Sequence, residues 1–249
     1  MKKQIIKDDE LIRVTQTHYE KGLHMPPHTH EFSAISLILK GGFQELIDGD
    51  SREVCRAKTL IKPAHVLHSD HYDDDCSILC IYLKDESIID TKARDVLKEW
   101  TGMYGINWNT FQPYFNTESL KERKQIINSF LAHLGTSKNA SDEIPEWIYH
   151  IKSYLDLNFT QNIQTSELAD KYGIHPVYLA RVFRKYYGLS IKDYIKSLRI
   201  RNSIASIFEK KQSLSQIAVG NGFADQSHFI RNFKQEVGTT PKGFKKIIA

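Results

Sequence analysis

Two arginines in the C-terminal part of the chain, Arg181 and Arg231, lie 50 residues apart in matching surroundings. The same separation relates Phe183 to Phe233, Gly188 to Gly238 and Tyr194 to Phe244. A guanidinium group can donate two parallel hydrogen bonds to the edge of a guanine, and it also pairs with phosphate. The sequence therefore holds two equivalent arginines, each suited to binding the edge of a base or the phosphate backbone of a nucleic acid.

A second pair of segments repeats at a slightly shorter distance. Residues 168–173 (LADKYG) and 217–222 (IAVGNG) are related by an offset of 49, which becomes 50 after the following turn. One residue inserted in the second turn explains the change. We therefore interpret residues 165–187 and 214–237 as two copies of one unit.

The first copy has the pattern of a helix-turn-helix unit. Thr165 is a suitable N-cap for its first helix, and Gly173 can end that helix in a left-handed conformation. His175 and Pro176 begin the second helix, because proline is favoured in a first turn. The residues expected to face its core are Leu168, Ala169, Tyr172, Leu179, Val182 and Phe183.

The second copy repeats this plan. Ser213 and Gln216 have the spacing of a capping box, and Gly222 ends the helix that they begin. Asp225 caps the next helix, which is expected to turn Phe229 and Phe233 inward. Between the copies, Ile191–Glu209 is predicted to be one long helix.

Charge is divided unevenly along the chain. Residues 144–249 hold 16 lysines and arginines and 8 acidic residues, a balance of +8; the net charge of +4 for the whole chain leaves −4 for residues 1–143. A basic half suggests binding to a polyanion. Two helices on a rigid connector can enter successive major grooves of DNA, about 34 Å apart. The alternative is a helical bundle with incidental basic faces.

The segment 222–233 (GFADQSHFIRNF), followed by 238–241 (GTTP), resembles the signature of the AraC/XylS regulators. The resemblance covers about residues 145–248. It implies a sequence-specific DNA-binding regulator of transcription, more often an activator, with reading helices at 176–186 and 226–236. The family's base-contacting positions fall on Val177, Tyr178, Ala180, Arg181, Gln226, Ser227, Ile230 and Arg231. Arg184 and Lys234 are candidates for contacts with phosphates.

Residues 10–83 have the pattern of β-structure. Short apolar runs at 32–39, 43–47 and 78–83 are separated by turn residues, which predicts a sandwich or barrel. Residues 86–105 and 117–134 have a helical pattern. Residues 135–142 are small and polar, and they are the predicted linker.

Residues 22–30 (GLHMPPHTH) and 63–68 (PAHVLH) resemble the pattern of the cupins, small β-barrels that many AraC-like regulators use to bind an effector. In metal-binding cupins, two histidines on one face of a strand and a third from a later strand hold the ion. These positions fall on His28, His30 and His68. Neutral imidazoles suit zinc, nickel, copper or iron.

The acidic ligand of the metal-binding cupins has no counterpart in this chain. Its position falls on Ala34 or Ile35, and Glu31 would face the opposite side of the strand. The histidines are therefore a three-histidine metal site or the polar mouth of a pocket for an organic effector, and both interpretations stay open.

Three cysteines, Cys55, Cys76 and Cys80, are too few and odd in number for a disulfide framework, which suggests the reducing cytoplasm. Cys76 and Cys80 share one face of a predicted strand and are expected in the core. The N-terminus has no apolar run after its lysines, and no segment approaches the roughly 18 apolar residues of a membrane span.

Together these patterns predict an α+β protein. Residues 1–85 would form a cupin-like β-barrel for effector binding, 86–143 a helical connector with a dimerisation face, and 144–249 the all-α DNA-binding domain. The predicted function is a cytoplasmic transcription regulator that binds double-stranded DNA and a small-molecule effector. A homodimer is expected, RNA polymerase is a candidate partner, and no membrane association is expected.

No enzymatic activity and no cofactor are expected, apart from a candidate divalent metal at the three histidines. Two alternatives remain beside the leading function. The chain could be a metal-responsive regulator, or a metal-binding cupin enzyme fused to a DNA-binding domain.

Overall fold

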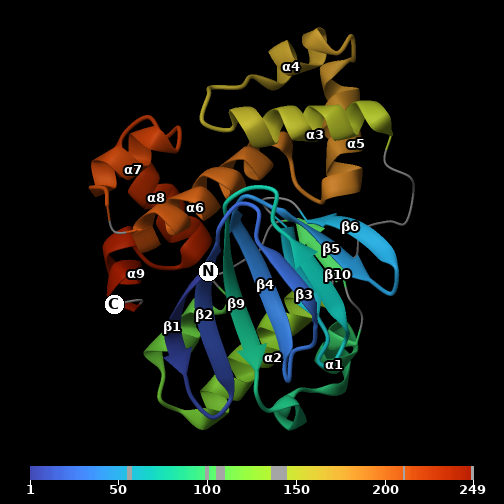
Figure 1. The fold of residues 1–249 in the computed structure, drawn as a ribbon. Helices are drawn as coiled ribbons and strands as arrows, with labels where there is room; N and C mark the ends of the chain where they lie inside the picture. The colour runs from blue at the N-terminus through green and yellow to red at the C-terminus, as the bar shows by residue number, and fades with distance from the viewer. Residues whose placement is uncertain (55–57, 99–100, 105–109, 136–144, 210, 248–249) are drawn as a thin grey trace.

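The computed structural model of the chain describes residues 1–54, 58–98, 101–104, 110–135, 145–209 and 211–247 (Figure 1). The predicted linker at 135–142 lies outside these ranges except for Gly135, and Cys55 lies outside them as well. The strands fill the lower half of the view in Figure 1, and the C-terminal helices lie above and beside them.

The N-terminal strands form two antiparallel sheets. The larger sheet has the order β1 (Lys2–Asp8), β2 (Ile12–Tyr19), β9 (Cys76–Leu83), β4 (Ser33–Lys40), β7 (Lys58–Lys62) and β10 (Thr101–Tyr104). The smaller sheet has the order β3 (His24–His28), β8 (His68–His71), β5 (Phe43–Ile47) and β6 (Asp50–Val54). The α+β class is confirmed, and in the described ranges the cupin-like part is an open sandwich and not a closed barrel.

The larger sheet is buried on both faces, which explains the near-continuous apolar runs of its central strands. On β9, Cys76, Ile78 and Cys80 belong to a core that includes Phe43 of the smaller sheet. The alternate residues of β9, Leu79, Ile81 and Leu83, belong to a second core on the other face. The predicted burial of Cys76 and Cys80 is confirmed.

Helices cover the outer face of the larger sheet. They are η1 (Glu86–Ile88), α1 (Thr91–Leu97), η3 (Gln112–Asn116) and α2 (Leu120–Gly135). The helix predicted over 117–134 is confirmed as α2, whose residues Ile127, Phe130, Leu131 and Leu134 are buried against the sheet.

The helix predicted over 86–105 is wrong in its second half. Helix α1 ends at Leu97, and residues 101–104 form β10, which pairs antiparallel with β7. Pairing satisfies backbone groups that an open β7 edge would leave exposed, and this tertiary gain overrides the weak local helical pattern.

In the described residues from 145 to 247, seven helices form the C-terminal part. They are α3 (Glu146–Asn158), α4 (Thr165–Lys171), α5 (Pro176–Tyr187), α6 (Ile191–Glu209), α7 (Leu214–Gly220), α8 (Gln226–Val237) and α9 (Pro241–Ile247). We call α4 with α5 unit one, and α7 with α8 unit two. Helix α6 has the predicted bounds, and in Figure 1 it crosses the ends of the strands between the two units.

The two units differ in how they are packed. Unit one has a core of its own, built with α3 and the first half of α6. Unit two shares one continuous core with the larger sheet, in which Leu37 and Leu79 of the sheet join Ile200 and Ile204 of α6. The second half of α6 therefore ties unit two to the N-terminal part.

The turn of unit two packs against the segment between α3 and α4. Gly222 has a φ of +78°, and a Cβ on it would lie 2.3 Å from the carbonyl oxygen of Thr160. The turn glycine of unit one, Gly173, has a φ of +63° but open space around it. Position 222 thus requires glycine because of its left-handed backbone and because of the close contact with Thr160. Position 173 requires it only because of its left-handed backbone.

We expect Gly222→Ala to lower the free energy of unfolding by about 3 kcal/mol or more, because left-handed strain and overpacking add together. Gly173→Ala is the matched control and should cost about 1–2 kcal/mol, the cost of strain alone. Urea denaturation followed by circular dichroism measures both. Equal losses for the two variants would contradict the close contact with Thr160.

Candidate nucleic-acid interface and histidine cluster

The two units have the same backbone hydrogen bonds at equivalent positions. In the turn between the two helices of each unit, the N–H of Ile174 donates to Ala169 O at 2.9 Å and the N–H of Phe223 donates to Ala218 O at 3.0 Å. The second helices both end at a left-handed glycine, Gly188 or Gly238. The duplication inferred from the sequence is therefore a duplication of structure.

The helix starts agree with the predicted caps at three of four positions. The Ser213–Gln216 capping box is present, Asp225 accepts from the N–H of His228 at 2.7 Å, and His175 Nδ1 accepts from the N–H of Val177 at 3.3 Å. Thr165 is not the cap of α4. Leu168 N–H already donates to Gln164 O, so Gln164 is the N-cap and Thr165 is the first helical residue.

Arg181 and Arg231, the two arginines predicted to contact bases, lie on the exposed side of their helices. Along residues 181–190 and 231–240 the order of buried, intermediate and exposed positions is identical. In α5, Leu179 and Phe183 are fully buried, as Phe229 and Phe233 are in α8. These buried anchors fix which side of each helix faces solvent.

Nine of the ten residues predicted to contact DNA are exposed: Val177, Tyr178, Ala180, Arg181, Arg184, Gln226, Ser227, Arg231 and Lys234. Ile230 is the exception, because it is half-buried and packs against the core of unit two. It follows directly after the buried Phe229, and its larger side chain reaches the core from the flank, where the equivalent Ala180 cannot.

The relative placement of the two units depends on side chains of α6. Arg199 donates to Phe159 O at 2.7 Å and to Gln161 O at 2.8 Å, next to the start of unit one. Lys196 lies 2.8 Å from a carboxylate oxygen of Glu236 on α8. Sequence reasoning missed both roles, because each depends on a partner more than 35 residues away.

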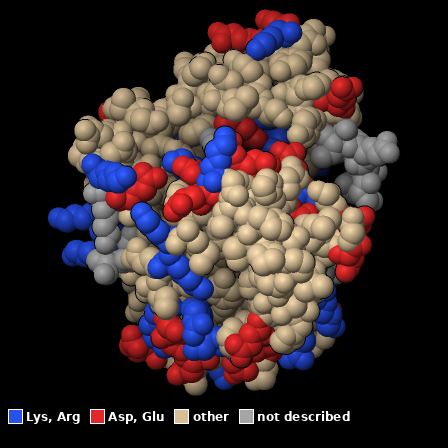
Figure 2. All heavy atoms as spheres, viewed as in Figure 1, with Lys and Arg blue, Asp and Glu red and all other residues tan. Residues whose placement is uncertain are grey.

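Charge on the face shown in Figure 2 is mixed. Described lysines and arginines are scattered among acidic residues around α6 and at the lower end, and much of the surface is uncharged. The basic excess of residues 144–249 is therefore not gathered on this face.

The N-terminal part holds the three histidines close together. The ring centroids of His28 and His68 are 4.3 Å apart, and His30 lies 5.1 Å from His28 and 4.9 Å from His68. His28 and His68 are opposite each other in the pairing of β3 with β8. One ligand atom from each ring lies within 4.8 Å of the others, a separation that suits three ligands of one ion.

Two carboxylates that the sequence did not point to lie beside this cluster. Glu45 and Asp70 are paired in register on β5 and β8, and both are buried with His68. The ammonium of Lys62 is 2.6 Å from Glu45 and 4.0 Å from Asp70. The sequence did not indicate that these two carboxylates are buried, because charged residues in strands usually face solvent.

Burial favours the neutral form of the His30 and His68 imidazoles. It is the largest cause lowering the pKa of His30, to about 3, and the charge of Lys62 adds to it. The pKa of His68 is lowered by the same two causes in the same order. Neutral imidazoles can bind a metal or accept hydrogen bonds from an organic molecule.

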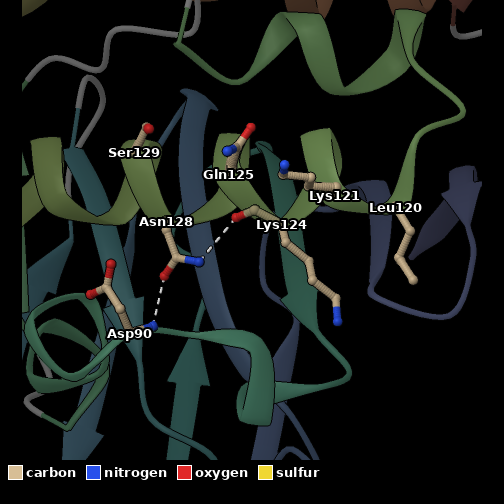
Figure 3. A pocket seen from close by; sticks show the side chains of 7 residues that line it. All are labelled: Asp90, Leu120, Lys121, Lys124, Gln125, Asn128 and Ser129. Carbon is tan, nitrogen blue, oxygen red and sulfur yellow. Dashed lines mark hydrogen bonds between the residues drawn. The ribbon is translucent and has the colours of Figure 1, made fainter.

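A hollow lies beside α2, within the predicted dimerisation region (Figure 3). Its lining residues are Asp90, Leu120, Lys121, Lys124, Gln125, Asn128 and Ser129. Asn128 Oδ1 accepts from the N–H of Asp90 at 2.7 Å, which joins α2 to the start of α1. Of the seven lining residues only Leu120 has a fully apolar side chain, but the aliphatic parts of the lysines and of Gln125 make much of the lining surface apolar.

Tandem helix-turn-helix units on one connecting helix define a DNA-binding domain. Residues 168–247 match the family model described as a helix-turn-helix domain. The chain is 30% identical over 112 residues to the bifunctional transcriptional activator/DNA repair enzyme AdaA of Bacillus subtilis, covering 44% of this chain and 53% of AdaA. The C-terminal part is therefore similar to the helix-turn-helix domains of known transcription regulators.

Further relatives extend the comparison. The Msm operon regulatory protein of Streptococcus mutans is 29% identical over 124 residues, 49% of this chain and 44% of that protein. The chain thus spans about half the length of AdaA and of this regulator. The HTH-type transcriptional activator RhaS of Yersinia pestis is 19% identical over 242 residues, 88% of this chain and 89% of RhaS. Among the described residues, no helix is long and apolar enough to cross a membrane.

The position of Lys62 leads to a prediction on the histidines. In the variant Lys62→Met, which removes the ammonium and leaves Glu45 in place, we expect the pKa of His30 and His68 to rise. The rise follows from loss of the nearby ammonium. NMR titration of the imidazole protons measures it, with Lys58→Met on the same strand as the control. Unchanged titration curves in Lys62→Met would contradict the assigned cause.

Proposed function

We propose that this chain is a sequence-specific DNA-binding regulator of transcription whose N-terminal part senses an effector. The observation that carries the proposal is the pair of equivalent units, each with an exposed arginine at the same position of its second helix. A side chain in the first turns of such a helix can reach base edges in the major groove.

The exposed residues divide by chemistry. Arg181 and Arg231 are suited to guanine, and Gln226 to adenine, because each can form two hydrogen bonds with the base. Val177 and Ala180 can contact thymine methyl groups. Arg184 and Lys234, near the ends of α5 and α8, are proposed to meet phosphates, which add affinity but no sequence information.

A route from the N-terminal part to the DNA-binding part supports the sensing role. Arg201 of α6 is buried and donates to Lys58 O at 2.6 Å, to Thr59 Oγ1 at 2.9 Å and to Ile38 O at 3.3 Å. Strand β7, which holds this arginine, also carries Lys62 beside the histidines. An effector that changes the position of β7 would change how α6 is held.

The remaining parts of the proposal follow from the class of protein. The proposed partners are double-stranded DNA, a small-molecule effector bound near His28, His30 and His68, and RNA polymerase. A homodimer would form through residues 86–134, with the hollow beside α2 on that surface. The proposed location is the cytoplasm, and the chain is assigned no catalytic role.

Arg231→Ala tests the reading role. We expect it to cost about 1–3 kcal/mol of binding to a duplex selected by the wild-type chain from a random pool, and much less on a scrambled duplex. Lys234→Ala should weaken binding to both duplexes similarly. Fluorescence anisotropy at a fixed salt concentration measures both. Equal losses on the two duplexes for Arg231→Ala would reject base reading by this residue.

A metal-responsive regulator is the second candidate, favoured by the convergence of His28, His30 and His68. The site fits a divalent ion because three imidazoles converge there and two buried carboxylates, those of Glu45 and Asp70, lie beside His68. A bound ion would supply a fixed positive charge, and the histidines would orient it. A metalloenzyme would also have to convert a substrate. In the part of the chain that the structure describes, no feature favours a metalloenzyme over a metal-responsive regulator.

Titration calorimetry with zinc chloride tests this second candidate. We expect the full chain to bind zinc and His28→Ala to lose that binding while keeping its basal affinity for DNA. His24→Ala on the same strand is the control, because His24 is exposed and outside the cluster. Equal zinc binding by the wild type and His28→Ala would exclude the histidine site.

A further inference from the structure

We propose that the first turn of α3 positions the reading arginine of unit one, with Trp147 as the positioning residue. The inference rests on the proposed DNA-binding function and goes beyond it, because Trp147 lies outside residues 168–247 and outside both reading helices. It concerns how one of the two arginines is held before DNA binds.

A stack of three side chains joins α3 to α5. The rings of Trp147 and Tyr178 are stacked, with centroids 5.9 Å apart and planes 29° apart. The guanidinium carbon of Arg181 lies 5.3 Å from the centroid of the Tyr178 ring. Tyr178 and Arg181 are three residues apart on one helix, so their side chains are neighbours on its surface.

The two rings differ in how firmly they are held. Tyr178 is 46% exposed, so its own helix leaves it largely in solvent. Trp147 is half-buried and packs against the core of unit one. Trp147 therefore restrains Tyr178, and Tyr178 in turn offers its ring to the guanidinium through a cation–π contact.

Restraint matters because a free surface arginine samples many rotamers. Ordering a long side chain on binding costs conformational entropy, and a side chain ordered beforehand loses less of it. Trp147 is thus expected to favour the rotamers of Arg181 that lie over Tyr178 and to increase affinity for the base pair that Arg181 reads.

Unit two holds its arginine differently. The residue equivalent to Tyr178 is His228, whose ring lies edge-on to Phe223 at 5.7 Å. Arg231 is attracted instead to the carboxylate of Asp225, the cap of the same helix. The stack is therefore a feature of unit one alone in the part of the chain that the structure describes.

The same turn of α3 also contacts the N-terminal part. The hydroxyl of Tyr149 donates to Glu53 Oε2 on β6 at 3.1 Å. Residues 145–149 are the first described residues after the linker. The turn that carries Trp147 is therefore attached to the smaller sheet, so a shift of that sheet would reach Arg181 through this stack.

Binding of the full chain to two duplexes tests the proposal. The first duplex is selected from a random pool by the wild-type chain. The second duplex differs from the first at one base pair. This base pair is the one at which the wild-type chain distinguishes the two duplexes and the Arg181→Ala variant does not. We expect Trp147→Leu, which keeps an apolar contact with the core, to reduce the preference for the first duplex by about two- to tenfold. Trp147→Phe should retain most of it.

The double variant separates positioning from packing. If Trp147 acts through Arg181, Trp147→Leu should not weaken binding to the first duplex any further in an Arg181→Ala background. Additive losses, or an equal loss of affinity on both duplexes, would overturn the proposal. If the wild-type chain enriches no sequence from the pool, the proposed function itself fails and the role of Trp147 in reading fails with it.

Discussion

Side chains of helix α6 contact three neighbouring parts of the molecule, and the relative placement of these parts depends on those contacts. Arg199 fixes it to the segment that precedes unit one, Lys196 to α8 of unit two, and Arg201 to strands β4 and β7. Leu37 and Leu79 of the larger sheet add an apolar contact with Ile200 and Ile204. One helix therefore sets both the spacing of the two reading helices and their attachment to the N-terminal part.

This arrangement gives a physical basis for the proposed combination of effector sensing and DNA recognition. If β7 moved, the buried guanidinium of Arg201 would lose hydrogen bonds. A buried polar group left without a partner lowers the stability of the folded state. Strand β7 ends at Lys62, whose ammonium balances Glu45 next to the three histidines. The effector site proposed at the histidines is thus joined to α6 through one strand, and a ligand bound there would act by favouring one arrangement over another.

The features that follow from local rules were predictable from the sequence. The bounds of α6, the capping box at Ser213, the cap at Asp225 and the inward turn of Phe183 and Phe233 all depend on neighbours along the chain. Strand β10, the open sandwich and the partners of Arg201 and Trp147 were not predictable, because each depends on segments that meet only in the fold. The histidine cluster was predicted from the resemblance to the cupin pattern, whereas Glu45 and Asp70 had no pattern to mark them.

The spacing of the two units is the central claim, and the spacing of their binding sites on DNA tests it most directly. A duplex selected by the full chain should contain two conserved blocks about one helical turn apart on one face. Inserting about five base pairs between the blocks moves one block to the opposite face of the duplex. We predict loss of sequence-specific binding in gel-shift titrations of this duplex, because α6 cannot follow the change. Unchanged affinity after the insertion would contradict the account.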